Sequence, residues 1–295
     1  MRWKAPYYPW PKTLWTYQMI PTKYSSTVIS NLMALCSFTE KDKTDDDTNI
    51  VMFSGSGGLL GMRHPQSDID YFAPRVFGPN NLATNVPGTN QLFQLVTNLI
   101  PKFGIRLSEI PKGKNGQPEI ICTEYPDKFL VNGAWITNIE YRTAWFYRAI
   151  DGIKCDSDSS DIGAGRIDFG ENGKVIEIML SWQNLQRDKL YSSATPKQII
   201  QWIREGKAIL PKEIYIGMGS TAPLDWSTVK KLTIKKATAY YWGEFFLGER
   251  EHRPIFPSPV VPFALLQVAI DTGTTNIDVK MMCPIVDEAE PLKTE

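Results

Sequence analysis

Two aspartates separated by one residue, Asp68 and Asp70, have the spacing in this sequence that best suits catalysis. On a β-strand, residues i and i+2 point to the same face, so the two carboxylates would lie side by side. Paired carboxylates can hold a Mg²⁺ ion together with the phosphates of a substrate. The chemistry that this pair could perform is therefore metal-assisted phosphoryl transfer.

The residues around the pair, GSGGLLGMRHPQSDIDY (Gly55 to Tyr71), resemble the nucleotidyltransferase motif, in which a Gly-Ser turn precedes Asp-x-Asp. Two departures count against this resemblance. The spacing is one residue longer than the motif has, and prolines interrupt the next segment (72–79), where a third carboxylate would be needed. We expect a glycine turn followed by a strand with a polar face. A Mg-dependent nucleotidyltransferase using Asp68 and Asp70 is the enzymatic alternative.

No other group of ligand-type residues matches a complete site. The loop CDSDSSDIGAGRID contains Asp156, Asp158 and Asp161, which could attract a cation, but an EF-hand needs Gly where Asp161 stands. The two histidines of the chain are too few for a three-histidine zinc site. We expect no cofactor and no intrinsic catalytic activity, and the three aspartates are weak metal candidates.

The composition argues against several classes of partner. Lys and Arg number 32, as do Asp and Glu, so no net field draws the chain to nucleic acid or to an anionic membrane. No apolar run is long enough to span a bilayer. The first residues, MRWKAPYYPWPK, are broken by charges and prolines, unlike a signal peptide, and the sequence leaves open whether a leader or anchor once preceded Met1.

The periodicity of apolar residues predicts three amphipathic helices, at Tyr24 to Phe38, Thr89 to Phe103 and Thr195 to Gly206. Each is followed by strand-like runs, and Asn-Gly turns typical of hairpins occur at 115–116, 132–133 and 172–173. The sequence therefore predicts an α+β fold of three consecutive units, each one helix packed on an antiparallel β-sheet. The expected divisions are an N-terminal arm (1–11), units at 12–78, 79–190 and 191–288, and a tail (289–295).

Aromatic side chains gather on the strand expected at AYYWGEFF (Ala239 to Phe246). Alternation along a strand places Tyr241 on one face and its two neighbours on the other. The side chains of one face should fill a core, and those of the other face must then be covered by another segment of the chain or by a partner protein. The segment RPIFPSPVVP (253–262) should cross the surface beside it as an extended arm, because its prolines lack ladder donors. We expect a surface that binds a protein or peptide, formed by Tyr240, Trp242, Phe246 and Phe256.

Several segments follow one another in a suggestive order: IEYRTAWFYRAIDGIK (139–154), RIDFGENGKVIEIMLSWQNL (166–185), a Thr-Pro-capped helix, AYYWGEFF (239–246) and VVPFALLQVAI (260–270). This order resembles bacterial extracytoplasmic proteins with PepSY-like or YycI/YycH-like units, over residues 13 to 286, with the PepSY-like unit at 79–190. The resemblance implies a non-catalytic bacterial protein outside the cytoplasm that binds a partner, restrains a protease or senses for a membrane kinase. The structural class leaves a further alternative, a subunit of a cell-surface assembly that uses its aromatic N-terminus as a contact arm.

Overall fold

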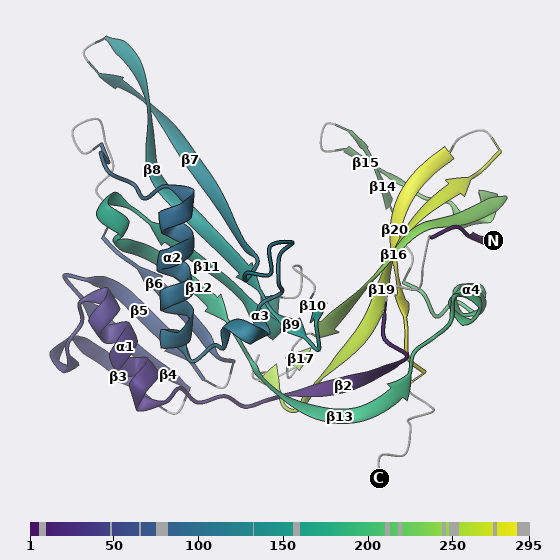
Figure 1. Cartoon of the computed structure of the whole chain (residues 1–295), viewed down its shortest axis with the longest axis horizontal. Coiled ribbons are helices and arrows are strands. Elements are labelled where there is room, and N and C mark those ends of the chain that lie inside the picture. The colour runs from purple at the N-terminus through teal and green to yellow at the C-terminus, as the bar shows by residue number, and fades with distance from the viewer. Residues whose placement is uncertain are drawn as a thin grey trace. The chain divides into compact units, whose positions relative to one another are not determined.

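The computed structural model describes residues 1–5, 10–47, 49–64, 66–74, 82–131, 133–155, 160–209, 213–217, 220–243, 246–247, 254–273 and 276–287. The chain divides into two units, neither of which is continuous in the sequence (Figure 1). Unit 1 comprises Met1–Gln18, Gln186–Trp242 and Pro259–Glu295, and unit 2 comprises Met19–Leu185 and Gly243–Ser258. Segments from both terminal parts of the sequence thus belong to unit 1, and most of the middle of the chain folds as unit 2.

Unit 2 is built on an eight-stranded sheet in which every neighbouring pair of strands is antiparallel. Asn172 and Gly173, both at positive φ, turn the chain between two of its strands, as the Asn-Gly dipeptide predicts. In spatial order the strands are β3 (Lys43–Asp46), β4 (Ile50–Gly55), β5 (Gly58–Arg63), β6 (Asp68–Phe72), β12 (Val175–Ser181), β11 (Ala164–Phe169), β8 (Ala134–Tyr147) and β7 (Ile120–Val131).

Two helices, α1 (Ser26–Cys36) and α2 (Thr89–Leu99), lie on the same face of this sheet (Figure 1). Ser25 begins α1, because its hydroxyl accepts a hydrogen bond from the Val28 backbone N–H at 3.2 Å. A 3₁₀ turn, η2 (Ile100–Phe103), extends α2 and ends at Gly104, whose φ is 81°. Short elements complete the unit: 3₁₀ turns η1 (Glu40–Asp42), η3 (Leu107–Glu109) and η4 (Glu171–Gly173), helix α3 (Ser160–Gly163), and strands β9 (Ala149–Ile150), β10 (Ile153–Lys154), β17 (Phe246–Leu247) and β18 (Pro254–Ile255).

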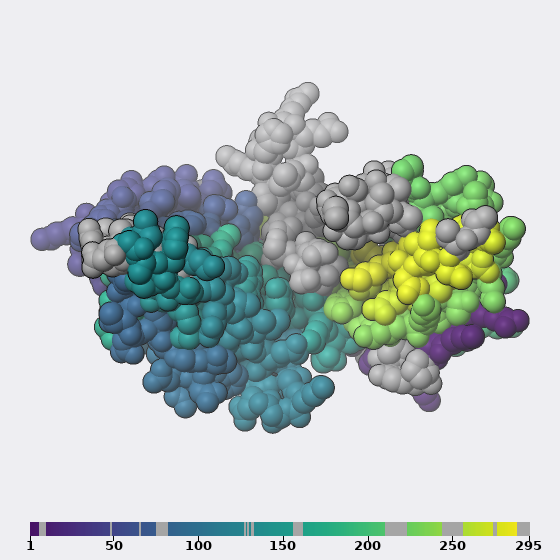
Figure 2. Space-filling model, turned by 90° about the horizontal axis from the view of Figure 1, so that it is seen from above, coloured from purple at the N-terminus to yellow at the C-terminus, as the bar shows by residue number. Residues whose placement is uncertain are grey.

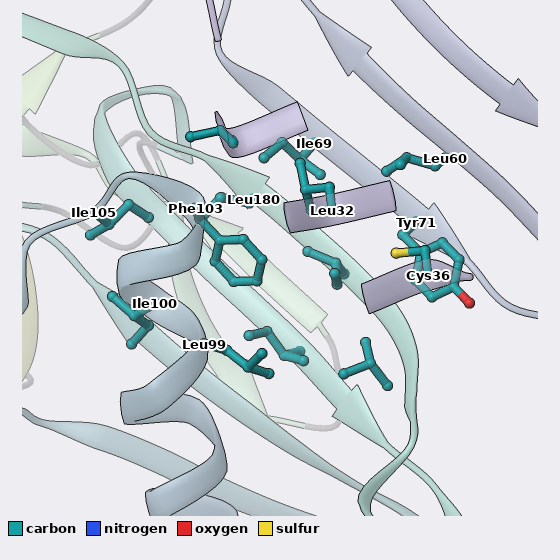
Figure 3. Close-up of a cluster of buried hydrophobic side chains, with 14 of the residues drawn as sticks. Leu32, Cys36, Leu60, Ile69, Tyr71, Leu99, Ile100, Phe103, Ile105 and Leu180 are labelled. Carbon is teal, nitrogen blue, oxygen red and sulfur yellow. The ribbon is translucent and has the colours of Figure 1, made fainter. Parts of the chain in front are cut away.

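The core of unit 2 lies between these helices and the sheet (Figure 3). Leu32 of α1 and Ile100 at the end of α2 are fully buried, and they face strand residues such as Leu60, Ile69 and Tyr71. Alternation explains the strand side, since every second residue of β5 and β6 is buried while the intervening residues face away from the helices. One continuous apolar layer therefore holds both helices.

Unit 1 contains most of a six-stranded sheet. Helix α4 (Pro196–Arg204) contacts β20 and β1, and it begins with a capping box between Thr195 and Gln198. The smaller elements are β14 (Glu213–Gly217), β15 (Ser220–Pro223) and η5 (Trp226–Thr228). The sheet order is β1 (Arg2–Trp3), β16 (Lys231–Gly243), β19 (Ser258–Asp271), β2 (Thr13–Ile20) and β13 (Asn184–Ser192), with β20 (Asn276–Pro284) antiparallel to β19.

The expectation of three consecutive units, each with one helix on its own sheet, is wrong. Strand β6 of the expected first unit pairs with β12 of the expected second, with Tyr71 opposite Ile178, so one sheet carries both helices. Strand β2 joins the sheet of the expected third unit instead. The three predicted helices themselves are confirmed, each somewhat shorter than predicted.

Two further expectations about extended segments need revision. The segment after Arg253 does not form a surface arm throughout, because Pro259 and Pro262 lie in β19, a central strand. The pairing of β19 with β20 starts at Phe263, after both prolines. At the N-terminus, β1 pairs in parallel with β16 and Trp10 is buried, so these parts of the expected arm belong to unit 1.

Within the residues described, no helix is both long and apolar enough to cross a membrane.

Candidate functional site: an apolar groove in unit 1

An apolar groove of about 150 Å³ opens on unit 1, and we call it the Trp242 groove. It brings together residues from β16, β19 and β20 and from the segment after α4. Most of these side chains are hydrocarbon, and Lys207 is the charged member. The lining residues are Lys207, Ile209, Trp242, Val261, Pro262, Phe263, Met282, Cys283, Pro284 and Val286.

The alternation of β16 places Trp242 in the groove. Its neighbour Tyr241 is fully buried, packs edge-on against Tyr17 with ring centroids 5.6 Å apart, and donates a hydrogen bond to the Trp15 carbonyl at 2.9 Å. Because successive strand residues point to opposite faces, Trp242 turns away from this core and is half-buried. The predicted division of this aromatic strand into a core face and an outer face is therefore confirmed.

A second predicted residue, Tyr240, contacts the wall of the groove. Its ring stacks on Phe263 with centroids 6.0 Å apart and an interplanar angle of 26°. Phe263 itself lines the groove and is buried. Stacked aromatic rings are stiff, so this wall keeps its shape at little entropic cost when a ligand binds.

A backbone bridge joins two lining residues of the groove, Ile209 and Met282. Ile209 N–H donates to the Met282 carbonyl at 2.8 Å, and Met282 N–H donates back at 3.2 Å. The Ile209 side chain is nevertheless 66% exposed, which is unusual for isoleucine. Because it lines the groove and is exposed, it is a residue that a bound ligand would cover.

Lys207 and Cys283 are the lining residues with chemistry beyond apolar contact. The ammonium of Lys207 lies 5.2 Å from the centre of the Trp202 ring and 3.9 Å from carboxylates of Glu205 and Asp287. Burial raises the pKa of the Cys283 thiol to about 12, so it stays protonated and is a poor nucleophile at neutral pH. The groove is thus built to hold an apolar group beside one cation.

Two of the four residues expected to form the binding surface belong to the groove or contact its wall, and two do not: Trp242 lines it and Tyr240 stacks on its lining residue Phe263. Phe246 pairs through its backbone with Ile255 in unit 2, and its side chain lies outside the described residues. Phe256 is half-buried and also belongs to unit 2. Sequence reasoning missed Ile209 and Met282, because the bridge between them joins positions far apart in the chain and leaves no local pattern.

The two candidate catalytic aspartates lie on β6 and alternate with Ile69 and Tyr71 of the core, so they point to the face opposite the helices, as alternation predicts. Both contact one arginine: the Arg63 guanidinium lies 3.5 Å from the Asp68 carboxylate and 2.5 Å from that of Asp70. The Gly55-Ser56 turn connects two strands and does not precede a helix. The cation beside these carboxylates is therefore an arginine of the neighbouring strand.

The same face carries a second group of acids that has its own arginine. Arg166 contacts Asp168 at 2.6 Å and Glu177 at 3.2 Å and lies over the Trp145 ring. Burial alone would lower the pKa of Arg166, but the hydrogen bond and the attraction of these carboxylates outweigh it and raise the pKa. Asp168 also accepts a hydrogen bond from Thr143 at 2.8 Å. This group is an ion-pair network that covers the sheet.

Among the residues that the structure describes, no three His, Cys, Asp or Glu side chains are grouped closely enough to hold a metal ion. Two weak metal candidates of the acidic loop, Asp156 and Asp158, lie outside the described residues. Asp161 is in α3, and its side chain is not among those described.

Substitutions at Tyr241 and Trp242 should show which of these two side chains belongs to the core and which to the groove. We expect Trp242→Ala to lower the free energy of unfolding by less than about 2 kcal/mol, because its ring is half-buried and its loss opens the groove rather than a closed cavity. Tyr241→Phe should cost about 1–3 kcal/mol, since it leaves the Trp15 carbonyl without its donor. Urea denaturation of both variants measures the two values, and a larger cost for Trp242→Ala would place its ring in the core.

Comparison with models of known protein families finds no match for this chain, and comparison with curated proteins finds no similar sequence.

Proposed function

We propose that this protein is a non-catalytic binding protein whose Trp242 groove receives one large apolar side chain from an extended segment of a partner protein. The observation that carries the proposal is the groove itself, which combines an apolar lining with a volume of about 150 Å³. A cavity of roughly this size accommodates a benzene ring. One phenylalanine, leucine or methionine side chain therefore suits it.

The rim supports a peptide rather than a free hydrocarbon as the ligand. Ile209 already pairs with the N–H and C=O of Met282, so a partner would reach the groove through side-chain contacts. Lys207 adds a cation whose two carboxylate neighbours are at 3.9 Å, a weak separation for an ion pair. An acidic residue next to the apolar anchor of the partner would therefore add to the interaction.

The proposal extends to the place and the class of the protein through the resemblance to PepSY-like and YycI/YycH-like units. Such a protein would act outside the cytoplasm of a bacterium, where it would bind or restrain a partner. The protonated state of Cys283 supports a binding role for the groove, because it leaves the lining without a reactive thiolate. The nucleotidyltransferase alternative is less well supported, since Arg63 lies beside the carboxylates of Asp68 and Asp70.

Selection of peptides displayed on phage against the immobilised full chain tests this function. We expect enriched peptides to share one large apolar residue, often beside Asp or Glu. Ile209→Glu should weaken the binding of these peptides at least tenfold, because it puts a charge at the mouth of an apolar groove and covering it would leave that charge unpaired.

Leu59→Glu is the matched control, since Leu59 is also an exposed apolar residue (41%) but belongs to unit 2. It should leave peptide binding unchanged. Enriched peptides without a common apolar residue, or peptides that bind the Ile209→Glu chain as tightly as the wild type, would contradict the proposed function.

A further inference from the structure

The hairpin of β7 and β8 extends well beyond the rest of the sheet in unit 2 (Figure 1). Strand β11 pairs with β8 only from Arg142 to Tyr147. In the part of the chain that the structure describes, the stretch from Ala134 to Tyr141 pairs with β7 alone. We call residues 126–131 and 134–141 the distal hairpin. An isolated two-stranded hairpin is only marginally stable in water, so this extension calls for an explanation.

The distal hairpin exposes large apolar side chains. Trp135 is 71% exposed and its cross-strand partner Leu130 is 54% exposed, and both lie near the tip. Figure 2 looks down on this teal end of unit 2, which reaches the surface. Exposed tryptophan and leucine side chains side by side are typical of a surface that another molecule covers.

The two edges of the hairpin differ in how strongly their residues oppose the addition of a further β-strand. The β7 edge has a register irregularity after Tyr125, followed by Pro126, Asp127 and Lys128, which are devices that block the addition of another strand. The β8 edge from Ala134 to Ile139, AWITNI, has no charge and no proline. The β7 edge is therefore protected against strand addition, whereas along Ala134 to Ile139 of β8 no further strand pairs among the residues that the structure describes.

We propose that this free edge of β8 pairs with the same edge of a second copy of the chain, antiparallel about a two-fold axis centred on Thr137. In this register Trp135 of each copy lies opposite Ile139 of the other, an aromatic and β-branched pair of the kind that stabilises sheets. Ala134 lies opposite Glu140, so no like charges meet. The contact closes on itself, which makes a dimer rather than a filament.

A second copy fits the free edge better than a lipid bilayer does. A membrane could cover Trp135 and Leu130, but it offers no partners for the backbone N–H and C=O groups along a strand edge. A strand of another copy provides these hydrogen bonds and covers the apolar side chains at once.

Charge substitutions at Thr137 test the dimer, with the full chain studied by sedimentation velocity over a range of concentrations. Thr137 is exposed, so Thr137→Lys and Thr137→Glu should both fold, which thermal melting monitored by circular dichroism verifies. The wild type should be a reversible dimer. Each variant alone should dimerise at least about tenfold more weakly, because two like charges meet at the axis, and a mixture of the two variants should regain association.

Thr44→Lys is the matched control, because Thr44 is an exposed threonine on β3, the opposite edge strand of the same sheet, and its dimerisation should equal that of the wild type. A wild type that stays monomeric would overturn the proposal, as would Thr137 variants that dimerise normally. Flotation of the wild type with phosphatidylcholine vesicles, abolished by Trp135→Ala, would assign the tip to a membrane and would equally overturn it.

Discussion

Replacing Arg148 with methionine is expected to lower the free energy of unfolding by about 3–5 kcal/mol, the usual cost of removing one partner from a buried ion pair. Arg148 is 9% exposed, and its guanidinium lies 2.8 Å from the Glu109 carboxylate and 5.5 Å from the centre of the Trp182 ring. It also donates hydrogen bonds to the carbonyls of Ile162 and Gln183. Without the guanidinium, the half-buried Glu109 carboxylate loses its strongest partner, and the two carbonyls lose a charged donor. Urea denaturation gives the value.

The direction of two pKa shifts supports this expectation. Burial lowers the pKa of Arg148, although attraction to Glu109 opposes the change. Burial by itself would raise the pKa of Glu109, but the charge of Arg148 and the hydrogen bonds from Arg106 and Trp182 outweigh it, and the pKa is lowered. Glu109 is therefore held ionised chiefly by Arg148, and the variant would leave it with Arg106 and Trp182 but without its strongest partner.

Lys154→Met provides the matched control. Lys154 contacts Glu119 at 2.6 Å, a distance similar to that of the buried pair, but the two side chains are 45% and 36% exposed. A solvated pair of this kind contributes about 0–1 kcal/mol, so the control should change stability little. Equal costs for the two variants would contradict the view that burial makes Arg148 important.

The second large effect is expected where Gly165 meets Phe146, its direct partner on the neighbouring strand. A Cβ atom on Gly165 would lie 2.7 Å from one ring carbon of Phe146 and closer still to two others. Gly165→Ala should therefore cost about 1–3 kcal/mol through overpacking. Phe146→Ala should cost about 3–5 kcal/mol, since the ring is fully buried.

The double variant decides whether these two costs share one cause. With the ring removed, the added methyl group has room, so the double variant should be at least about 1 kcal/mol more stable than the sum of the single costs predicts. Gly61→Ala is the control within the same sheet, because its Cβ would have no heavy atom nearer than 4.0 Å, and its effect should be within about 0.5 kcal/mol. Additive costs for Gly165 and Phe146 would show that the overlap is relieved elsewhere.

Local features of the fold could be predicted from the sequence, and long-range pairing could not. The apolar periodicity of α1 and the Thr-Pro start of α4 depend on neighbouring residues alone, and both helices are confirmed. The pairing of Tyr71 with Ile178 depends on which of many alternating strands meet, and no local pattern specifies that choice. For this reason two expected sheets proved to be one.

The candidate site likewise has features that could be predicted from the sequence and features that could not. The opposite orientations of Tyr241 and Trp242 follow from the two-residue period of a strand, and they could be predicted. The mouth of the groove depends on a bridge between Ile209 and Met282, which only the folded chain brings together. The aspartates of β6 are a further example. Alternation predicts that they share one face of the strand, but it does not predict that Arg63 lies beside both of them.

The proposed function requires that the Trp242 groove can take up an apolar group. Nuclear magnetic resonance of methionine methyl groups tests this directly. Met282 lines the groove, whereas Met62 is fully buried in the core of unit 2 and serves as the internal reference. In the full chain labelled with [¹³C-methyl]methionine and titrated with toluene, we predict a saturable shift of the Met282 signal and no shift of the Met62 signal. A Met282 signal that does not move, or that moves no more than Met62, would contradict the account.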